Sequence, residues 1–305
     1  MTKTPLVSIL MNCRNGEKYL KEAIESIISQ TYQNWEIIFW DNDSRDNSRK
    51  IVLSYEDSRV KYFHTSTKSN LGEARENAFK QINGEFLSIL DVDDIWMKGK
   101  LNEQLKYFED PTVGICYSNT LFFSSRWKEV LYPNNIEMND SSQKLITNYH
   151  ISLETVMLRV AYIRQLSKSF DRDYSHISDF DLITRLSTRC KVVYCPKVLA
   201  GWRVHPESEG YTKPGRFNKE RSLWIANNLS NVDFAGKRMA LVVLSKLVKA
   251  SNRMTSSSNY KDFPNDVLFR YSSTRNYAYV LFSYIPIVPL LIMQIKGYLY
   301  RNKWF

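Results

Sequence analysis

Residues 86–94 read Phe-Leu-Ser-Ile-Leu-Asp-Val-Asp-Asp (FLSILDVDD), an apolar run of strand length that leads directly into a cluster of carboxylates. An unbroken apolar run indicates a strand that is buried on both faces, as in a sheet covered by helices on either side. Carboxylates this close raise one another's pKa unless a cation neutralises them. The stretch therefore predicts a strand of a covered sheet whose end carries a charged site.

The first 125 residues repeat this alternation of strand and helix. The apolar runs of strand length lie at residues 6–11, 37–40, 60–63, 86–90 and 114–123. The amphipathic stretches between them lie at residues 17–30, 46–55, 72–82 and 98–108. Strands that alternate with helices predict an α/β fold with a Rossmann-like parallel sheet and flanking helices. Ligands bind such sheets beyond the carboxyl ends of the strands.

Polar side chains follow three of these predicted strands, at Asn12–Asn15, Asp41–Ser44 and Asp91–Asp94. The ends of parallel strands meet at one edge, so we expect these groups to share one crevice. A set of oxygen ligands favours Mg²⁺ or Mn²⁺, and Mg²⁺ is commonly held by one or two carboxylates together with substrate phosphates. The alternative is that the acidic run only caps the helix that begins near Lys98.

Three long motifs resemble the inverting glycosyltransferases of family 2, which have the GT-A fold. They are VSILMNCRNGEKYLKEAIESIISQTYQNWEIIFWDNDSRDNS at 7–48, NLGEARENAFKQINGEFLSILDVDD at 70–94, and SFDRDYSHISDFDLITRLSTRCKVVYCPKVLAGWRVHPES at 169–208. They occur in the family's order and at suitable spacing. The resemblance covers roughly residues 5–208 and implies a nucleotide-sugar donor.

The resemblance also implies roles for individual residues in donor binding. The metal that bridges the donor diphosphate, Mn²⁺ or Mg²⁺, would bind Asp93 with Asp91. The family often has a second Asp at the position of Asn42, and an amide there could still pair with a pyrimidine edge. The alternative for Asp41 is a turn and helix cap. The positions that would hold the base and ribose are Asn12, Arg14, Asp41, Asn42 and Asp91.

A base is needed to deprotonate the acceptor hydroxyl, and Asp179 occupies the family's position for it. A carboxylate at a helix N-terminus is ionised and well placed to accept a proton. The family usually has Glu where this chain has Ser178. The alternative is that Ser178 or Asp179 only caps the helix. Asp181 is a substitute base or an acceptor contact, and Asp171 is a further acceptor contact.

Arg203 and His205 lie in the segment WRVHP, after an apolar run. In the family an Arg or His of this segment often closes over the diphosphate or the metal, so both residues are candidate phosphate clamps. A lone His is more often structural than catalytic, and that is the alternative for His205.

The charge of the chain is unevenly distributed. The 305 residues carry a formal net charge of +10, of which residues 1–210 hold −1 and residues 211–305 hold +11. We expect residues 1–210 to form the catalytic domain, with a nucleotide-sugar half at 1–125 and an acceptor half at 126–210. Residues 211–305 then form a basic helical region whose partner is an anionic membrane surface. The alternative is a solvated basic helical surface.

The most apolar segment of the chain, Tyr279–Met293, lies in that basic region and contains Pro286 and Pro289. It is shorter than the ~20 apolar residues of a spanning helix, and it is followed by basic and aromatic residues, as in segments that lie on a lipid surface. A buried core or dimer segment and a re-entrant membrane segment are the alternatives. The chain starts without a secretory pattern, and its four cysteines lack CxxC spacing. We expect a cytoplasmic protein, peripheral at the inner face of the cell membrane.

Together these features predict a metal-dependent inverting glycosyltransferase that uses a saccharide or lipid-linked acceptor in surface polysaccharide biosynthesis. A sugar nucleotidyltransferase is one alternative, although the segment after the first strand lacks a Gly-rich phosphate loop. A non-catalytic binding protein of the same fold is favoured by Ser178 and Asn42. No RNA-reading motif is present, so we expect no nucleic acid partner.

Overall fold

The computed structural model describes residues 4–131, 145, 149–208, 216, 217, 220, 221, 224 and 228. The strands of this part are β1 (Val7–Cys13), β2 (Trp35–Asn42), β3 (Val60–Thr65), β4 (Phe86–Ile89), β5 (Ile95–Trp96), β6 (Val113–Phe123), β7 (Lys128–Val130), β8 (Met157–Arg159) and β9 (Lys191–Arg203). The α-helices are α1 (Glu17–Ile28), α2 (Ser48–Leu53), α3 (Leu71–Phe79), α4 (Lys100–Leu105), α6 (Val160–Ile163) and α7 (Ser178–Ser187). The short 3-10 helices are η1 (Lys106–Glu109) and η2 (Leu153–Thr155).

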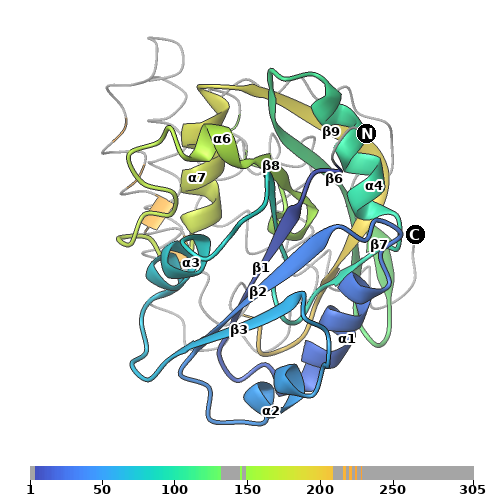
Figure 1. Ribbon diagram of the computed structural model, residues 1–305, viewed down its shortest axis with the longest axis vertical. Helices are drawn as coiled ribbons and strands as arrows, with labels where there is room; N and C mark the ends of the chain where they lie inside the picture. The colour runs from blue at the N-terminus through green and yellow to red at the C-terminus, as the bar shows by residue number, and fades with distance from the viewer. Residues whose placement is uncertain are drawn as a thin grey trace, which may run out of the picture.

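All these strands belong to one sheet, in the order β3-β2-β1-β4-β8-β6-β9-β5, with β7 paired to β6 (Figure 1). Strands β1 to β4 run parallel to one another, and β6 runs parallel to β9. Strand β8 is antiparallel to both of its neighbours, β4 and β6, and so joins the two parallel groups. The expected nucleotide-sugar and acceptor halves therefore share a single sheet.

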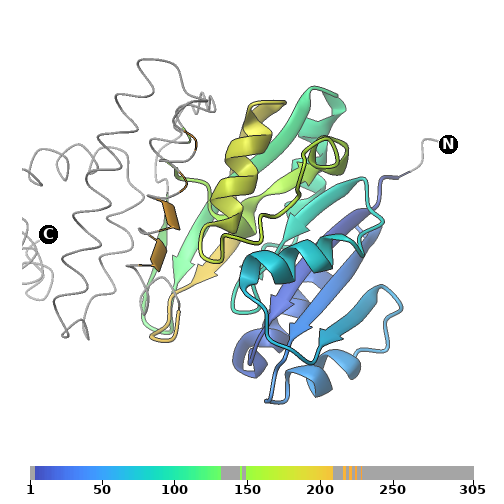
Figure 2. The ribbon, with the colours of Figure 1, turned by 90° about the vertical axis from the view of Figure 1, so that its left-hand side faces the viewer.

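Helices cover both faces of the sheet, with α1, α2 and α4 on one side and α3, α6 and α7 on the other (Figures 1 and 2). Two apolar clusters correspond to these two sides. Within β1, Ile9 and Met11 belong to the cluster of α1, whereas Leu10 belongs to the cluster of α3 and α7. This is the alternation of a strand that is buried on both faces, as the apolar runs predicted.

The helix α1 shows how the sequence sets one of these layers. Its buried residues are Leu20, Ala23, Ile24 and Ile27. Three- and four-residue spacings place side chains on one face of a helix, which here packs against the sheet. The polar residues between them face solvent, so the boundary between core and surface follows from local periodicity.

The expected α/β fold is confirmed, and the five strands predicted within the first 125 residues, β1 to β4 and β6, all run in one direction. Strand β8 was not predicted. The antiparallel strand β8 has three residues, too few to show a periodic pattern, and its pairing depends on distant strands. The apolar run before the segment WRVHP belongs to one long strand, β9. Among the described residues no helix is long and apolar enough to cross a bilayer. The segment Tyr279–Met293 and most of the basic region 211–305 lie outside the described residues.

Candidate active site

The carboxyl ends of β1 and β2 lie side by side, with Asn12 opposite Trp40 and Cys13 opposite Asp41. Asn12 is 9% exposed, and neither polar atom of its side chain has a hydrogen-bond partner among the described residues. A buried amide without a partner carries a desolvation cost of about 1–3 kcal/mol, which a bound ligand can relieve. Asn12 therefore lies at the end of β1 with a side-chain amide that is available to bind a polar ligand.

Asp41 is 3% exposed and is held from two directions. Its Oδ1 accepts a hydrogen bond from the Ser44 amide at 2.8 Å, and its Oδ2 accepts one from the Tyr62 hydroxyl at 2.7 Å. Desolvation raises the pKa of Tyr62, and the hydrogen bond to Asp41 raises it further. The hydrogen bond from the Ser44 amide is the turn contact that was the alternative role for Asp41, and it is present here.

Asn42 has partners within the chain. Its Nδ2 donates to the Ser69 carbonyl at 2.8 Å, and its Oδ1 accepts from the Ser69 amide at 3.1 Å. These bonds tie the end of β2 to the loop before α3. Arg14, at the end of β1, is exposed. Contacts of Asn42 and Arg14 with a nucleotide base remain predictions.

The acidic run forms a tight turn after β4, in which the Asp94 amide donates to the Asp91 carbonyl at 3.1 Å. Asp94 is 4% exposed, and its Oδ1 accepts from the Arg203 amide at 2.8 Å. The Asp91 side chain is 41% exposed. Desolvation raises the pKa of Asp91, and the Asp93 and Asp179 charges add to the rise. Asp91 thus lies among like charges at the expected crevice.

Arg75 of α3, which sequence analysis did not single out, provides the positive charge of this crevice. It is 3% exposed; its Nη2 donates to Asp91 Oδ1 at 3.2 Å and its Nη1 donates to Ser178 Oγ at 2.7 Å. The charge of Arg75 acts to lower the pKa of Asp91 and of Asp179. The segment NLGEAREN belongs to the motif at 70–94, so the signal for Arg75 was in that stretch.

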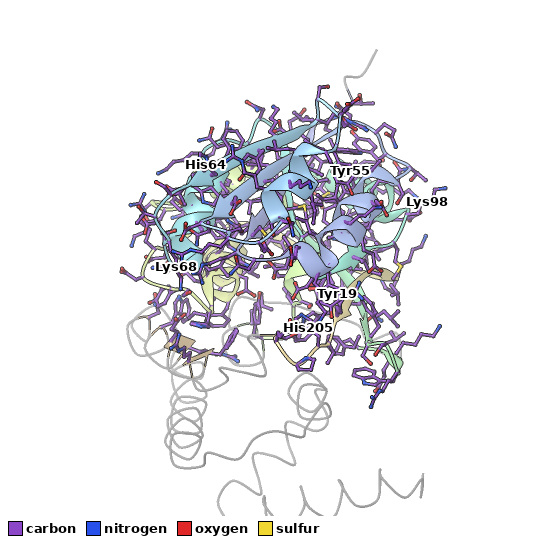
Figure 3. The ribbon with its side chains drawn as sticks, turned by 90° about the horizontal axis from the view of Figure 1, so that it is seen from below. Tyr19, Tyr55, His64, Lys68, Lys98 and His205 are labelled. Carbon is purple, nitrogen blue, oxygen red and sulfur yellow. The ribbon has the colours of Figure 1, made fainter. Side chains whose placement is uncertain are left out.

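Arg203 and His205 hold the acidic turn from β9. Arg203 Nε donates to the Asp93 carbonyl at 2.8 Å, and the guanidinium lies 4.5 Å from the Tyr19 ring centroid. His205 Nε2 lies 2.9 Å from Asp93 Oδ2, and its ring stands beside Tyr19 (Figure 3). Arg203 also pairs with Glu22, and its side chain is 14% exposed. Both predicted clamps therefore position the carboxylates, and direct contact with a phosphate remains a prediction.

Asp179 lies in the first turn of α7, on the other side of Arg75. Its side chain is half-buried, and Tyr149 Oη donates to Asp179 Oδ2 at 3.5 Å. Desolvation raises the pKa of Asp179 above its ordinary value, against the opposing charge of Arg75. A raised pKa makes an ionised carboxylate a stronger proton acceptor near neutral pH. The geometry thus suits the predicted base.

The two predicted acceptor contacts have partners of their own. Asp181 is 2% exposed and binds Arg185, with 2.6 Å between Oδ2 and Nη2. Asp171 Oδ2 accepts from Lys168 at 2.8 Å. Although desolvation acts to raise it, the pKa of Asp171 is lowered by Lys168 and by a backbone amide. The structure thus places Asp181 inside the protein, and it leaves acceptor contact by either residue a prediction.

The donor set at the acidic turn fits a divalent cation whose coordination is completed by a substrate. Among the described residues no group of three His, Cys, Asp or Glu side chains is arranged to hold a metal by itself. Asp91 and Asp93 supply hard oxygen ligands, as Mg²⁺ and Mn²⁺ prefer. His205 Nδ1 is buried without a hydrogen-bond partner among the described residues. This end of the crevice therefore also has a polar atom that a ligand can bind.

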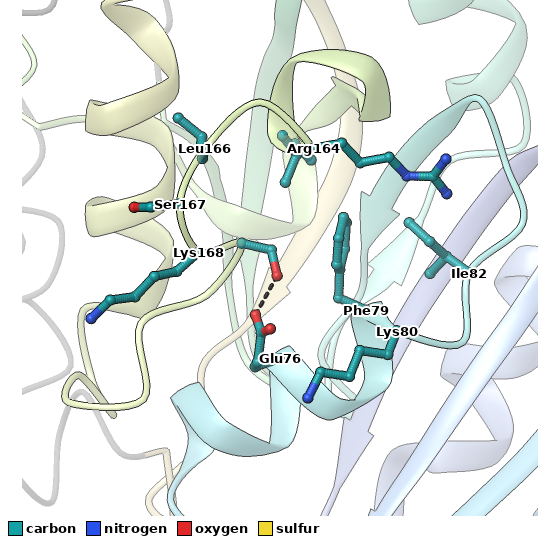
Figure 4. Close-up of a pocket in the computed structure, with 10 residues that line it drawn as sticks. Glu76, Phe79, Lys80, Ile82, Arg164, Leu166, Ser167 and Lys168 are labelled. Carbon is teal, nitrogen blue, oxygen red and sulfur yellow. Dashed lines mark hydrogen bonds between the residues drawn. The ribbon is translucent and has the colours of Figure 1, made fainter.

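A separate pocket of about 320 Å³ lies between the end of α3 and the loop after α6 (Figure 4). Glu76 closes one side of it by accepting hydrogen bonds from Ser169 Oγ and from the Phe170 amide, the latter at 3.0 Å. Lys80, Arg164 and Lys168 line its rim. None of the predicted site residues lines this pocket.

An α/β sheet with carboxylates at its strand ends, and a half-buried carboxylate at the start of α7, is the arrangement that the motifs of the GT-A fold predicted. The family model described as "Glycosyl transferase family 2" matches residues 8–171. The chain therefore belongs to glycosyl transferase family 2 and is a glycosyltransferase, as the motifs predicted.

Curated relatives agree with this assignment. The UDP-Glc:alpha-D-GlcNAc-diphosphoundecaprenol beta-1,3-glucosyltransferase WfgD of Escherichia coli is 29% identical over 223 residues, which cover 72% of this chain and 84% of that protein. The putative teichuronic acid biosynthesis glycosyltransferase TuaG of Bacillus subtilis is 30% identical over 116 residues, 37% of this chain and 46% of that protein.

Solved structures share the fold. TarS residues 1–349 of S. aureus, in complex with UDP, superpose with a TM-score of 0.62 at 20% identity, over 83% of this chain and 72% of that one. The mannosyltransferase PcManGT of Pyrobaculum calidifontis, in complex with GDP-Man and Mn²⁺, gives a TM-score of 0.64 at 16% identity, over 96% and 85%. At these identities the likeness shows the fold alone.

Proposed function

We propose that this enzyme transfers a sugar, with inversion and with the help of a divalent metal, from a nucleotide-sugar donor to a saccharide or lipid-linked acceptor. The observation that carries this proposal is the Arg75 bridge. It connects Asp91, on the donor side, to Ser178, the residue next to Asp179. A donor-binding carboxylate and a base thus face one crevice, as a direct displacement requires.

The proposed reaction is a single displacement at the anomeric carbon. The acceptor oxygen forms a bond to that carbon while the bond from the carbon to the diphosphate oxygen breaks. Asp179 takes the hydroxyl proton, and the nucleoside diphosphate leaves with the bonding electron pair. Because attack and departure occur on opposite faces, the anomeric configuration inverts.

The donor is proposed to lie along the ends of β1, β2 and β4. Asn12, with its unpaired amide, and Asp41 would contact the nucleoside, and Asp91 would contact the ribose. Asp93 and Asp91 would hold Mn²⁺ or Mg²⁺, which supplies electrostatic stabilisation for the leaving diphosphate. His205 contacts the Asp93 carboxylate, and Arg203 holds the same turn through the Asp93 carbonyl and the Asp94 carboxylate.

The acceptor class is proposed from the relatives. WfgD, by its name, acts on a sugar linked through a diphosphate to undecaprenol, and TuaG is named for teichuronic acid biosynthesis. A lipid-linked saccharide on a route to a surface polysaccharide is therefore the acceptor we propose here. Such an acceptor would be met at the inner face of the cell membrane, which is where we propose that the enzyme acts.

A donor screen tests this function. The purified chain is incubated with UDP-, GDP- and dTDP-sugars, with Mn²⁺, Mg²⁺ or EDTA, and nucleoside diphosphate release and thermal stabilisation are measured. We expect one donor to stabilise the protein only with metal, and Asp93→Asn to abolish that stabilisation. Absence of stabilisation and release for every donor would contradict the proposal.

The matched control is Asp110→Asn. Asp110 binds Thr112 and Lys191 before the start of β6, and β6 runs parallel to β9. Because Arg203 and His205 lie at the end of β9, Asp110 is at the opposite edge of the sheet. Its substitution is expected to leave metal-dependent stabilisation by the donor unchanged.

A further inference from the structure

The helix that carries Asp179 lacks a cap of its own. The residue at its N-cap, Ile177, has no side-chain capping bond. The carboxylate of Glu220, distant in sequence, binds the turn that leads into the helix. Its Oε2 accepts from the backbone amides of Ser175, His176 and Ile177 at 3.0, 2.7 and 3.3 Å. Glu220 thus fixes the backbone up to the N-cap residue of α7.

The same carboxylate also holds a side chain in this turn. Glu220 Oε1 lies 2.8 Å from His176 Nδ1, and the His176 side chain is 7% exposed. Although desolvation acts to raise it, the pKa of Glu220 is lowered by the hydrogen bond from His176 and by the backbone amides. The carboxylate is thus stabilised in its charged form, the form that favours a helix N-terminus.

Trp224 makes a second contact with α7. Its Nε1 donates to Asp181 Oδ1 at 2.8 Å, and the residue is 3% exposed. Its ring packs edge-on against Phe180, with 4.9 Å between ring centroids. Glu220 and Trp224 are four positions apart and each is helical, and between them they contact two points of α7.

These contacts enclose Asp179 on both sides along the chain. Ile177 is bound on one side, and Phe180 and Asp181 are bound on the other. Phe180 also packs edge-on against Tyr149 at 5.1 Å, and Tyr149 Oη donates to Asp179 Oδ2. A continuous set of packed rings therefore leads from Trp224 to the base.

We infer that Glu220 and Trp224 are positioning residues that clasp the first turn of α7 and fix Asp179 toward the acceptor hydroxyl. The inference rests on the proposed role of Asp179. Neither residue touches the reacting groups; both act through the helix. Displacement of a catalytic group by about 1 Å lowers turnover by about 10²-fold, so a loosened clasp affects the rate of transfer more than donor binding.

The test compares full-length wild type with Glu220→Gln and with Trp224→Phe, which keeps the aromatic packing and removes the indole donor. Glu103→Gln is the matched control. Glu103, on α4, is also a paired carboxylate and binds Lys106 and Lys197. Kinetics use UDP-glucose and a synthetic GlcNAc-diphospholipid. Amide hydrogen exchange of residues 175–181 is followed in the same proteins without any ligand.

For Glu220→Gln we expect kcat to fall about tenfold, the KM for UDP-glucose to stay within twofold, and amide exchange at 175–181 to quicken about tenfold. Trp224→Phe is expected to show a smaller loss of kcat. Unchanged exchange and kcat, or a loss of kcat and donor affinity in parallel with the folded fraction, would overturn the inference.

Failure of the proposed function would look different. A folded wild type that neither binds nor turns over any nucleotide sugar overturns the transferase proposal and, with it, a catalytic role for the clasp. If wild type is active on another donor of the screen, the same comparison is made with that donor. The exchange measurement decides separately whether Glu220 holds the start of α7.

Discussion

Arg75 Nη1 donates a hydrogen bond of 2.7 Å to Ser178 Oγ across 103 positions of sequence, and both residues are buried. Through this bond the helix α3, which belongs to the family motif at 70–94, contacts the helix that carries Asp179. Since Arg75 also pairs with Asp91, one guanidinium connects the turn after β4 to the start of α7. Arg75 thus joins the carboxylate of Asp91 to the hydroxyl of the residue next to Asp179.

Arg75→Met is expected to lower the free energy of unfolding by about 1–3 kcal/mol, because Ser178 and Asp91 lose a buried charged donor. We also expect weaker donor binding, since Asp91 is left without its countercharge. Urea denaturation and nucleotide-sugar titration measure the two effects.

Arg172→Met is the control for Arg75. Its pair with Glu73 spans 3.6 Å, and its side chain is 53% exposed. An exposed pair contributes at most about 1 kcal/mol. Equal destabilisation by the two variants would contradict the bridging role of Arg75.

Asp179→Asn is expected to lower kcat by about 10²–10⁴-fold, the contribution typical of a positioned base, with donor affinity retained. In wild type the pKa of Asp179 is raised, so activity falls as pH drops through a value above the ordinary 3.8. The acid limb of the pH profile of kcat measures the pKa of Asp179 directly. Near-wild-type turnover by Asp179→Asn would move the role of base to another residue.

Gly72→Ala is expected to destabilise the protein and reduce activity. A Cβ at this position would lie 2.1 Å from the Tyr174 carbonyl oxygen and 2.5 Å from that of Asp171, so α3 would have to move away from the loop that precedes α7. Gly99→Ala is the control, because a Cβ at Gly99 meets no atom within 4 Å. Thermal unfolding of both variants, with activity per folded protein, makes the comparison. Similar melting temperatures for the two would contradict the predicted clash.

Lys100 gives a pH dependence of stability. It is fully buried, donates to the Val156 carbonyl at 3.2 Å, and its pKa is lowered by desolvation to about 7. Between pH 7 and its ordinary 10.5 the unfolded chain binds a proton that the native state lacks. The free energy of unfolding therefore rises with pH through this window, by up to about 5 kcal/mol.

Lys100→Met is expected to remove that rise, because the unfolded chain then binds no extra proton at this position. Lys106→Met, at a side chain that is 63% exposed, is the control. Urea midpoints from pH 7 to 10 measure the slope for each variant. Parallel slopes for wild type and Lys100→Met would show that Lys100 keeps an ordinary pKa.

The sequence alone determined the longer elements of the first 125 residues and their burial, because strand runs and helical spacing are properties of neighbouring residues. The run at 86–90 and the spacing of Leu20, Ala23, Ile24 and Ile27 predicted β4 and α1 directly. The family motifs identified the strand ends and Asp179 as candidate groups. Their common edge followed from the rule that parallel strands end together.

Only the tertiary structure decided which partners these groups have. His205 meets Asp93 across 112 positions, and Glu220 meets His176 across 44. Such pairings depend on how distant elements pack, and no local pattern encodes them. The orientation of β8, the confinement of Arg203, the burial of Asp181 and the bridge made by Arg75 all belong to this class. The sequence therefore identified the candidate groups, and packing determined which of their side chains remain free to bind a ligand.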